Sequence, residues 1–242
     1  APEIPAYGGT CPVLETGYEH VVFLRPRRFG KSTLVSMLEH YYDLGKRERF
    51  DALFGGLWVH AHPTAEQGRY LVLTLDFSSV STDAGEDALR RSFADTVRGG
   101  VRTFLLRYRE LIPALSDLYP GLDNVKDAEA LIGTVLSVVA ATSHKIYLLI
   151  DEYDHFANRL LSAGEGTVYD TIVKKTGFVR TFYATLKSGT RSGAVGRMFV
   201  TGVSPLMLDD LSSGFNIATH ASMDIGLNEL AGFTRADTER AV

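Results

Sequence analysis

Residues 23–32 read Phe-Leu-Arg-Pro-Arg-Arg-Phe-Gly-Lys-Ser. The apolar run 21–24 predicts a short buried strand that leads into this stretch. After the stretch, apolar side chains follow the spacing of an amphipathic helix: Leu34, Met37, Leu38 and Tyr41. A strand, a turn, Gly-Lys-Ser and a helix form the layout in which N–H groups at a helix N-terminus bind phosphate. The stretch therefore predicts an α/β fold with a site for a nucleoside triphosphate.

The loop departs from the usual phosphate-binding pattern at one position. That pattern is Gly, four residues, then Gly-Lys-Ser/Thr, and Arg25 stands where the first Gly is expected. Glycine suits a backbone that bends tightly around phosphates, so Arg25 and Pro26 must shape this loop differently. Arg27 and Arg28 can donate planar forks of N–H groups to phosphate oxygens. The alternative is that Gly-Lys-Ser occurs by chance and that the arginines form a solvated basic turn.

The chemistry of such a loop assigns a role to each of its residues. Backbone N–H groups of residues 29–32 would face the β-phosphate, and Lys31, a catalytic candidate, would neutralise β- and γ-phosphate charge. The Ser32 hydroxyl would bind Mg²⁺. The predicted nucleotide-binding residues are Arg27, Arg28, Phe29, Gly30, Lys31, Ser32 and Thr33.

An acidic pair far along the chain supplies the second half of such a site. The apolar run 146–150 predicts a buried strand, and Asp151-Glu152 follow it directly. An acidic residue at the carboxyl end of a parallel strand points into the crevice where ligands bind. We therefore expect Asp151 to hold Mg²⁺ and Glu152 to act as the general base on the attacking water. The alternative is a strand that ends in a solvated acidic turn.

Further strands and helices alternate along the chain, which predicts an α/β three-layer fold with a mainly parallel, five-stranded sheet. The other predicted strands are 70–77, 197–201 and, as a short fifth strand, 222–225. The predicted helices are the one that runs to residue 42, then 84–111, 127–141 and 178–187.

Polar residues near the ends of these elements are secondary candidates. Thr201 ends the fourth predicted strand, where its hydroxyl could contact the γ-phosphate or the attacking water as a catalytic residue. The alternative role for Thr201 is to cap a loop. Arg180, Arg191 and Arg197 are candidate arginine fingers, which would act on the nucleotide of a neighbouring copy in a homo-oligomer.

Composition bounds the classes of protein to which the chain can belong. The 242 residues are 45% hydrophobic and 22% charged, and the formal net charge is −4, which argues against a uniformly basic nucleic-acid binder. Cys11 is the one cysteine, so no intramolecular disulfide forms and a reducing, intracellular compartment (cytoplasm or nucleus) is expected. No apolar run is long enough to predict a membrane-spanning helix.

Four segments together resemble the AAA-ATPase-like family of predicted P-loop ATPases. They are residues 24–32, Leu-Asp-Phe-Ser at 75–78, Leu-Ile-Asp-Glu-Tyr-Asp at 149–154 and Thr-Gly-Val-Ser-Pro at 201–205. The resemblance implies that the missing first Gly is a family trait, and that the fold is the additional-strand type of P-loop NTPase. It also implies Walker A and Walker B motifs, ATP and Mg²⁺ as cofactors, and an attached nuclease domain that acts on nucleic acid.

These observations set the expected domains and three readings of function. Residues 1–20, rich in Pro and Gly, are a flexible lead-in, 21–233 form the P-loop ATPase-like domain, and 234–242 begin a truncated C-terminal helix or lid. The leading reading is Mg²⁺-dependent ATP hydrolysis that drives or gates an attached effector domain. The alternatives are a nucleotide-binding switch or scaffold with negligible hydrolysis, and a phosphotransferase. ATP is favoured over GTP because the chain lacks the Asn/Thr-Lys-x-Asp motif that reads guanine.

Overall fold

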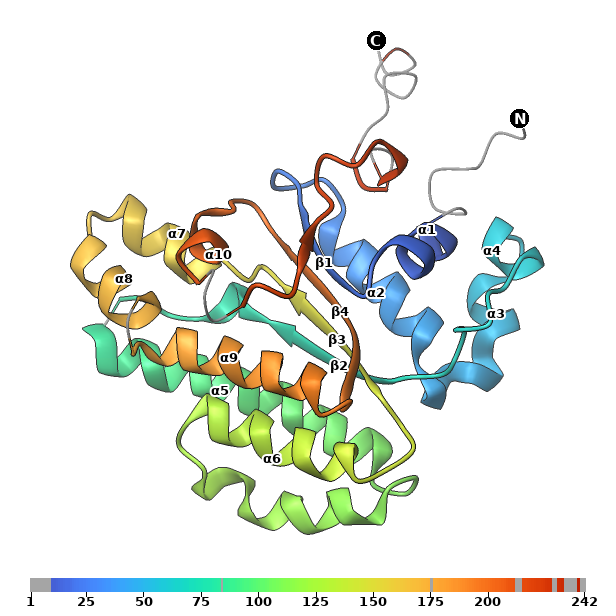
Figure 1. Cartoon of the computed structure of the whole chain (residues 1–242), viewed down its shortest axis with the longest axis horizontal. Helices are drawn as coiled ribbons and strands as arrows, with labels where there is room; N and C mark the ends of the chain where they lie inside the picture. Colours follow the sequence, from blue (N-terminus) through green and yellow to red (C-terminus); the bar gives the residue numbers. More distant parts are fainter. Residues whose placement is uncertain are drawn as a thin grey trace.

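The computed structural model describes residues 10–83, 85–174, 176–211, 215–227, 230–232 and 239. Within these residues, five parallel strands form one sheet in the order β2-β3-β4-β1-β5 (Figure 1). The strands are β1 (His20–Leu24), β2 (Leu71–Asp76), β3 (Ile146–Asp151), β4 (Val195–Gly202) and β5 (Thr219–His220). Because β4 lies between β1 and β3, the sheet has the inserted strand that defines the additional-strand type, as the family resemblance implied.

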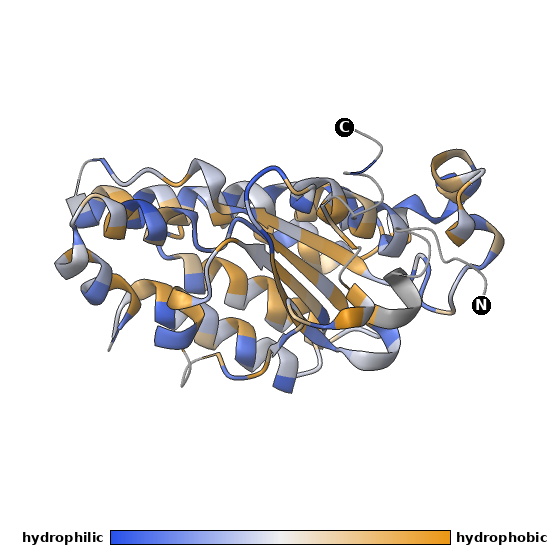
Figure 2. Cartoon of the chain, turned by 90° about the horizontal axis from the view of Figure 1, so that it is seen from above, coloured by the Kyte–Doolittle hydropathy of each residue, from blue (hydrophilic) through white to orange (hydrophobic). Residues whose placement is uncertain are grey.

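Helices cover both faces of the sheet and complete three layers. On one face lies α2 (Lys31–Tyr42), and on the other lie α5 (Gly85–Tyr108), α6 (Ala128–Ala140) and α9 (Phe178–Arg191) (Figure 1). Each face of the sheet has its own hydrophobic core, and alternate strand residues point into one core or the other. Phe23 packs in the core on the α2 side, and Val22 packs in the core on the opposite side. Figure 2 shows the strands as hydrophobic along most of their length, as expected for a sheet that is buried on both faces.

The longer predicted elements are confirmed within a few residues, but the fifth strand is displaced. Residues 222–225 were predicted as a strand, whereas the structure places β5 at Thr219–His220 and turns and a 3₁₀ helix, η4 (Ile225–Leu227), after it. Both residues of β5 are exposed and pair with Val21 and Val22. A two-residue exposed strand carries no hydrophobic pattern, so only its pairing with β1 defines it.

The remaining helices were not predicted, because most of them are too short to carry a clear periodic pattern. They are α1 (Thr10–Gly17), η1 (Leu44–Arg49), α3 (Phe50–Phe54), α4 (Trp58–Ala61), η2 (Phe77–Ser79), η3 (Pro113–Asn124), α7 (His155–Ser162), α8 (Gly166–Val173) and α10 (Leu206–Asp210). Helix α1 lies inside the segment 1–20 that the sequence suggested as a flexible lead-in. Residues 1–9, and all of 234–242 except 239, lie outside the described residues.

Arg197 anchors α1 to the sheet. Its guanidinium donates to the carbonyl oxygens of Leu14 (3.2 Å), Glu15 (3.2 Å) and Tyr18 (2.9 Å). Arg197 is the third residue of β4, near the edge of the sheet opposite to the carboxyl ends of the strands. These bonds engage the Arg197 guanidinium within its own chain and give it a structural role in place of the expected role as an arginine finger. Among the described residues, no helix is long and apolar enough to span a bilayer.

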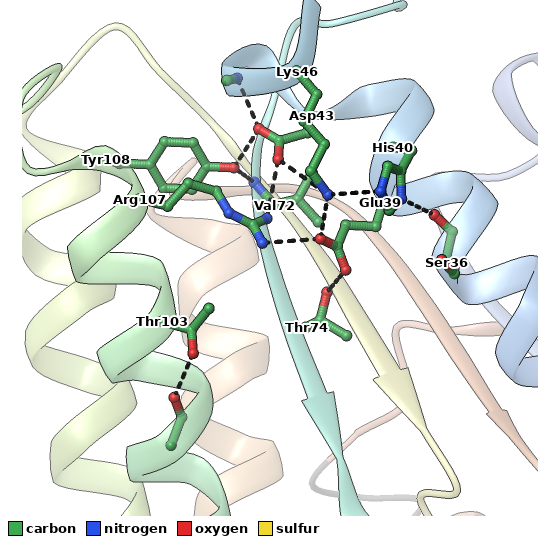
Figure 3. A network of polar contacts seen from close by, with 12 residues as sticks. Ser36, Glu39, His40, Asp43, Lys46, Val72, Thr74, Thr103, Arg107 and Tyr108 are labelled. Atoms are coloured by element: carbon green, nitrogen blue, oxygen red, sulfur yellow. Dashed lines mark hydrogen bonds and ion pairs between the residues drawn. The ribbon is translucent and has the colours of Figure 1, made fainter. Parts of the chain in front are cut away.

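A buried polar network fixes the far end of α2 (Figure 3). Asp43, which is 0% exposed, accepts hydrogen bonds from the Tyr108 hydroxyl (2.6 Å) and from Arg107 (3.0 Å), both at the end of α5. Arg107 also donates to Glu39 (3.0 Å), and the Tyr108 hydroxyl accepts from the backbone N–H of Val72 in β2 (2.8 Å). Helix α2, which follows the Gly-Lys-Ser turn, is thereby held to α5 and to the edge of the sheet.

Candidate functional site

The Gly-Lys-Ser turn joins β1 to α2 through a loop with two left-handed residues. Arg28 has φ 67° and Gly30 has φ 78°, so the chain turns sharply before the helix begins at Lys31. Gly30 is the N-cap of α2 and provides no side-chain acceptor for the first N–H groups of the helix. These N–H groups, at the positive end of a twelve-residue helix, are therefore a suitable place for an anion.

Arg25 explains how the loop forms without the first glycine. Its guanidinium donates to the carbonyl oxygens of Leu24 (2.9 Å), Ser222 (2.7 Å) and Leu227 (3.2 Å), and it lies 4.2 Å from the centroid of the Phe23 ring. The side chain thus faces the segment 222–227 that follows β5. Arg25 fastens the start of the loop to the C-terminal part of the sheet, a role that no local sequence signal revealed.

The other predicted loop ligands lie around the N-terminus of α2. Arg27 and Arg28 are exposed, and within the described part of the chain neither guanidinium has a hydrogen-bond or ion-pair partner. Ser32 and Thr33 are exposed on the first turn of α2, and Phe29 is partly buried. The guanidinium groups and hydroxyls are therefore accessible to a ligand at this end of the helix.

Lys31 is the buried cation of the site. Its side chain is only 3% exposed, and its Nζ lies 3.3 Å from Oε1 of Glu152. The same ammonium donates to the carbonyl oxygen of Pro26 (3.3 Å). The fold thus brings Lys31 from the first strand–helix turn into contact with the acidic pair after β3, as the sequence reading required.

Asp151 is a buried carboxylate at the carboxyl end of β3. It is 4% exposed and accepts a hydrogen bond from the N–H of Glu152 (2.9 Å). Burial raises the pKa of the Asp151 carboxyl, a hydrogen bond from Ser32 opposes that shift, and the charges of Asp76 and Glu152 add to it. Asp76 lies beside it because Asp76 of β2 and Asp151 of β3 are partners in the ladder.

Glu152 adopts a backbone conformation that is rare for a residue with a side chain. Its φ is 50°, in the left-handed region. Such a conformation costs about 1 to 2 kcal/mol and persists only where the surroundings enforce it. The turn directs the carboxylate of Glu152 toward Lys31, while Asp151, one residue earlier, contacts Ser32.

Thr201 lies near the carboxyl end of the central strand β4. This strand lies between β1, which leads to Lys31, and β3, which leads to Asp151 and Glu152. It is 0% exposed and pairs with Phe23 of β1, and the carbonyl oxygen of Thr201 accepts from the N–H of Tyr153 (3.1 Å). Phe199, two residues earlier, packs on the α2 side, so alternation places the Thr201 side chain on that side too. Its hydroxyl has no hydrogen-bond partner among the described residues.

The donor set fits a small divalent cation that is bound together with phosphates. Among the described residues there is no group of three or more His, Cys, Asp or Glu side chains that could hold a metal ion alone. A Ser32 hydroxyl and an Asp151 carboxylate are hard oxygen ligands, the type that Mg²⁺ takes in small number when phosphate oxygens and water complete its shell. The residues present therefore suit Mg²⁺ with a nucleotide better than a separate metal centre.

The fold and the site together define a class of protein. An all-parallel sheet with the additional strand, a Gly-Lys-Ser turn before α2 and an acidic pair after β3 are consistent with a P-loop-like fold. The family model described as "Predicted AAA-ATPase" matches residues 12–212, and the chain belongs to this AAA-ATPase-like family. Membership implies nucleotide binding. Searches of curated proteins and of solved structures gave no significant match.

Proposed function

We propose that this chain binds ATP with Mg²⁺ and hydrolyses it. The observation that carries the proposal is the position of Lys31, a buried cation at the N-terminus of α2 in direct contact with the acidic pair after β3. A buried lysine at a helix N-terminus suits an anion with several negative charges, such as a triphosphate. Adjacent carboxylates suit the metal ion and the water that hydrolysis requires.

Each predicted residue has a role in this proposal. The first N–H groups of α2 and Lys31 bind the β- and γ-phosphates, and the exposed Arg27 and Arg28 donate to phosphate oxygens from the loop. Phe29, Gly30 and Thr33 form the rest of the phosphate-binding turn. Ser32 and Asp151 would hold Mg²⁺, which when bound would supply positive charge to the phosphate oxygens.

Hydrolysis requires Glu152 to leave Lys31. When phosphate oxygens neutralise the Lys31 ammonium, the Glu152 carboxylate is released to accept a proton from the attacking water. The unpartnered hydroxyl of Thr201, at the end of the central strand, is our candidate to orient that water or to contact the γ-phosphate. Hydrolysis would then drive or gate an attached effector domain, and the resemblance to a family whose members often carry a nuclease domain is the reason to propose an effector that acts on nucleic acid.

The experiment that tests the proposal is titration calorimetry with ATP and Mg²⁺ on the wild type, Lys31→Ala and Lys126→Ala. Lys126 is exposed between η3 and α6, so its variant controls for the loss of one positive charge. We expect binding by the wild type and by Lys126→Ala, and none by Lys31→Ala. Binding that survives in Lys31→Ala would contradict the proposed site, and a folded wild type that does not bind would contradict the proposed function.

A second candidate function is a nucleotide-binding switch with negligible hydrolysis. The observation that favours it is the Lys31–Glu152 ion pair, since a pair that opens on binding reports the presence of nucleotide without turnover. Phosphate release by the wild type and by Glu152→Gln separates the two functions. Turnover that Glu152→Gln abolishes supports hydrolysis, and equally negligible turnover by both proteins supports the switch.

A further inference from the structure

Two segments at the carboxyl ends of β3 and β4 are connected by several hydrogen bonds. The acidic turn (residues 151–154) contains Glu152, and the β4 loop (residues 201–204) contains Thr201. The N–H of Tyr153 donates to the carbonyl oxygen of Thr201 (3.1 Å), and the Tyr153 hydroxyl donates to the carbonyl oxygen of Ser204. The proposed base and the proposed water-orienting hydroxyl therefore lie on two segments that are held together.

Asp154 makes the strongest of these connections. Its carboxylate is 1% exposed and accepts the N–H of Ser204 (2.6 Å), the N–H of Val203 (3.1 Å) and the side-chain amide of Asn158 (2.7 Å). Among the described residues, no cation forms an ion pair with Asp154. Its charge is thus stabilised by amide donors alone, two of which belong to the β4 loop.

The carboxylate of Asp154 does not cap the helix that Asp154 begins. Asp154 is the N-cap of α7, where aspartate usually accepts from the first N–H groups of its own helix. Here the side chain makes no cap hydrogen bond. The helix forgoes a stabilising cap, and the carboxylate instead holds a loop that is 49 or 50 residues away in the sequence.

Gly202 leaves the space that this arrangement needs. A Cβ at residue 202 would lie 2.3 Å from Oδ1 of Asp154 and 2.5 Å from Cδ1 of Tyr153. Only glycine allows the acidic turn to approach the end of β4 so closely. The contact between the two segments is therefore specified from both sides.

We infer that Asp154 is a positioning residue for hydrolysis, which holds Glu152 and Thr201 in a fixed relation on the phosphate side of the sheet. This inference rests on the proposed ATPase function. Asp154 touches no group that we place on the nucleotide, so its loss should reduce turnover and leave nucleotide affinity nearly unchanged. Oδ2 accepts from all three donors, and Oδ1 accepts a second bond from the N–H of Val203 (3.2 Å). An amide keeps one acceptor oxygen, but it loses the negative charge that these donors stabilise and turns its NH₂ group toward the N–H of Val203.

The test compares Asp154→Asn and Asn158→Ala with the wild type and with Tyr183→Phe. Tyr183 is a matched control because its buried hydroxyl lies near Asp154 but has no hydrogen-bond partner among the described residues. ATP affinity is measured by calorimetry with Mg²⁺, turnover by phosphate release, and the β4 loop amides by hydrogen exchange. Asn158→Ala removes one donor and keeps the carboxylate, so it provides a milder variant if Asp154→Asn does not fold.

We expect Asp154→Asn to lower kcat by about 10- to 100-fold with a change in ATP Kd of less than about threefold, since small displacements of catalytic groups have effects of this size. Asn158→Ala should lower kcat by a smaller factor, Tyr183→Phe should not, and exchange at Val203 and Ser204 should be faster in Asp154→Asn. Unchanged kcat in Asp154→Asn and Asn158→Ala, or parallel losses of kcat and affinity, would overturn the inference while the wild-type ATPase stands. A wild type without turnover would instead overturn the hydrolytic function, and the inference with it.

Discussion

Lys31 and Glu152 form an ion pair of 3.3 Å between the N-terminus of the helix after β1 and the turn after β3. The lysine side chain is 3% exposed and that of the glutamate 18%, so solvent screens the pair only partly. The cation that we assign to phosphate and the carboxylate that we assign to water therefore neutralise each other. A nucleotide has to compete with Glu152 for Lys31.

Replacing Glu152 by Gln should tighten ATP binding and abolish turnover. Gln keeps the shape of the side chain but removes the charge that competes with phosphate for Lys31, a gain of about 1 kcal/mol or roughly fivefold in Kd. Calorimetry with ATP and Mg²⁺ measures the change. Glu110→Gln, at an exposed position, is the control and should bind as the wild type does. Weaker binding by Glu152→Gln would show that Glu152 does not compete with the nucleotide.

The backbone at Glu152 predicts an unusual order of stability for two substitutions. Glu152→Ala and Glu152→Gly both lose the ion pair with Lys31, but only glycine adopts φ 50° without strain. We expect the glycine variant to be the more stable of the two by about 1 kcal/mol in urea unfolding. The same two substitutions at Glu129, in the first turn of α6, should rank in the opposite order because alanine favours a helix. If the alanine and glycine variants of Glu152 are equally stable in urea, the backbone at this residue is not strained.

Restoring the usual glycine at residue 25 should destabilise this protein. Arg25→Gly removes three hydrogen bonds from a charged group to carbonyl oxygens and a contact with the Phe23 ring, a loss of about 2 kcal/mol. Arg27→Gly has the same backbone entropy cost but removes an exposed side chain without a partner in the described residues. Chemical denaturation of both variants isolates the contacts of Arg25. Equal stability of the two would mean that Arg25 does not anchor the loop.

The hydroxyl of Tyr108 should contribute about 1 to 3 kcal/mol to the free energy of unfolding. It donates to Asp43 and accepts from the N–H of Val72, and both partners are buried. Tyr108→Phe leaves that N–H without its partner and removes one of the two donors to Oδ1 of Asp43, the other being the N–H of Gly45 (2.8 Å). Denaturant unfolding measures the cost. Tyr119→Phe, at a residue that is 41% exposed, should change stability by less than about 0.5 kcal/mol. A similar small effect at Tyr108 would contradict the network in Figure 3.

The contribution of Glu39 to stability should disappear in acid. Burial acts to raise the pKa of Glu39, but the hydrogen bond from Lys46 and the charges of Arg107 and Lys46 outweigh it, so the pKa lies below 4.5. Because the folded state binds this proton less tightly than the unfolded state, the stabilisation is present above pH 4.5 and is lost as pH falls through the folded pKa. The difference in unfolding free energy between the wild type and Glu39→Gln should therefore shrink as the pH falls below 4.5. If this difference in unfolding free energy stays constant as the pH falls, the pKa of Glu39 is not lowered in the folded state.

Local pattern was sufficient for the long elements and insufficient for the short ones. Helix α5 and strand β3 have strong periodic or continuous apolar sequences, and both were predicted within a few residues. Helices α7 and α8 and strand β5 were missed, since each is short and is defined by the surfaces on which it packs. Asp154 directly follows Tyr153 in the sequence, but no local pattern indicated that its carboxylate reaches the β4 loop.

By itself the sequence determined the class of fold and the two halves of the candidate site. Buried parallel strands need continuous apolar runs, and phosphate chemistry needs Gly-Lys-Ser and a carboxylate after a strand; such requirements can be read from consecutive residues. The tertiary structure alone decided the partners: Lys31 with Glu152, Arg25 with the segment 222–227, and Asp154 with the β4 loop. The physical reason is that each of these contacts joins segments that are distant in the chain and that only the order of the strands in the sheet brings together.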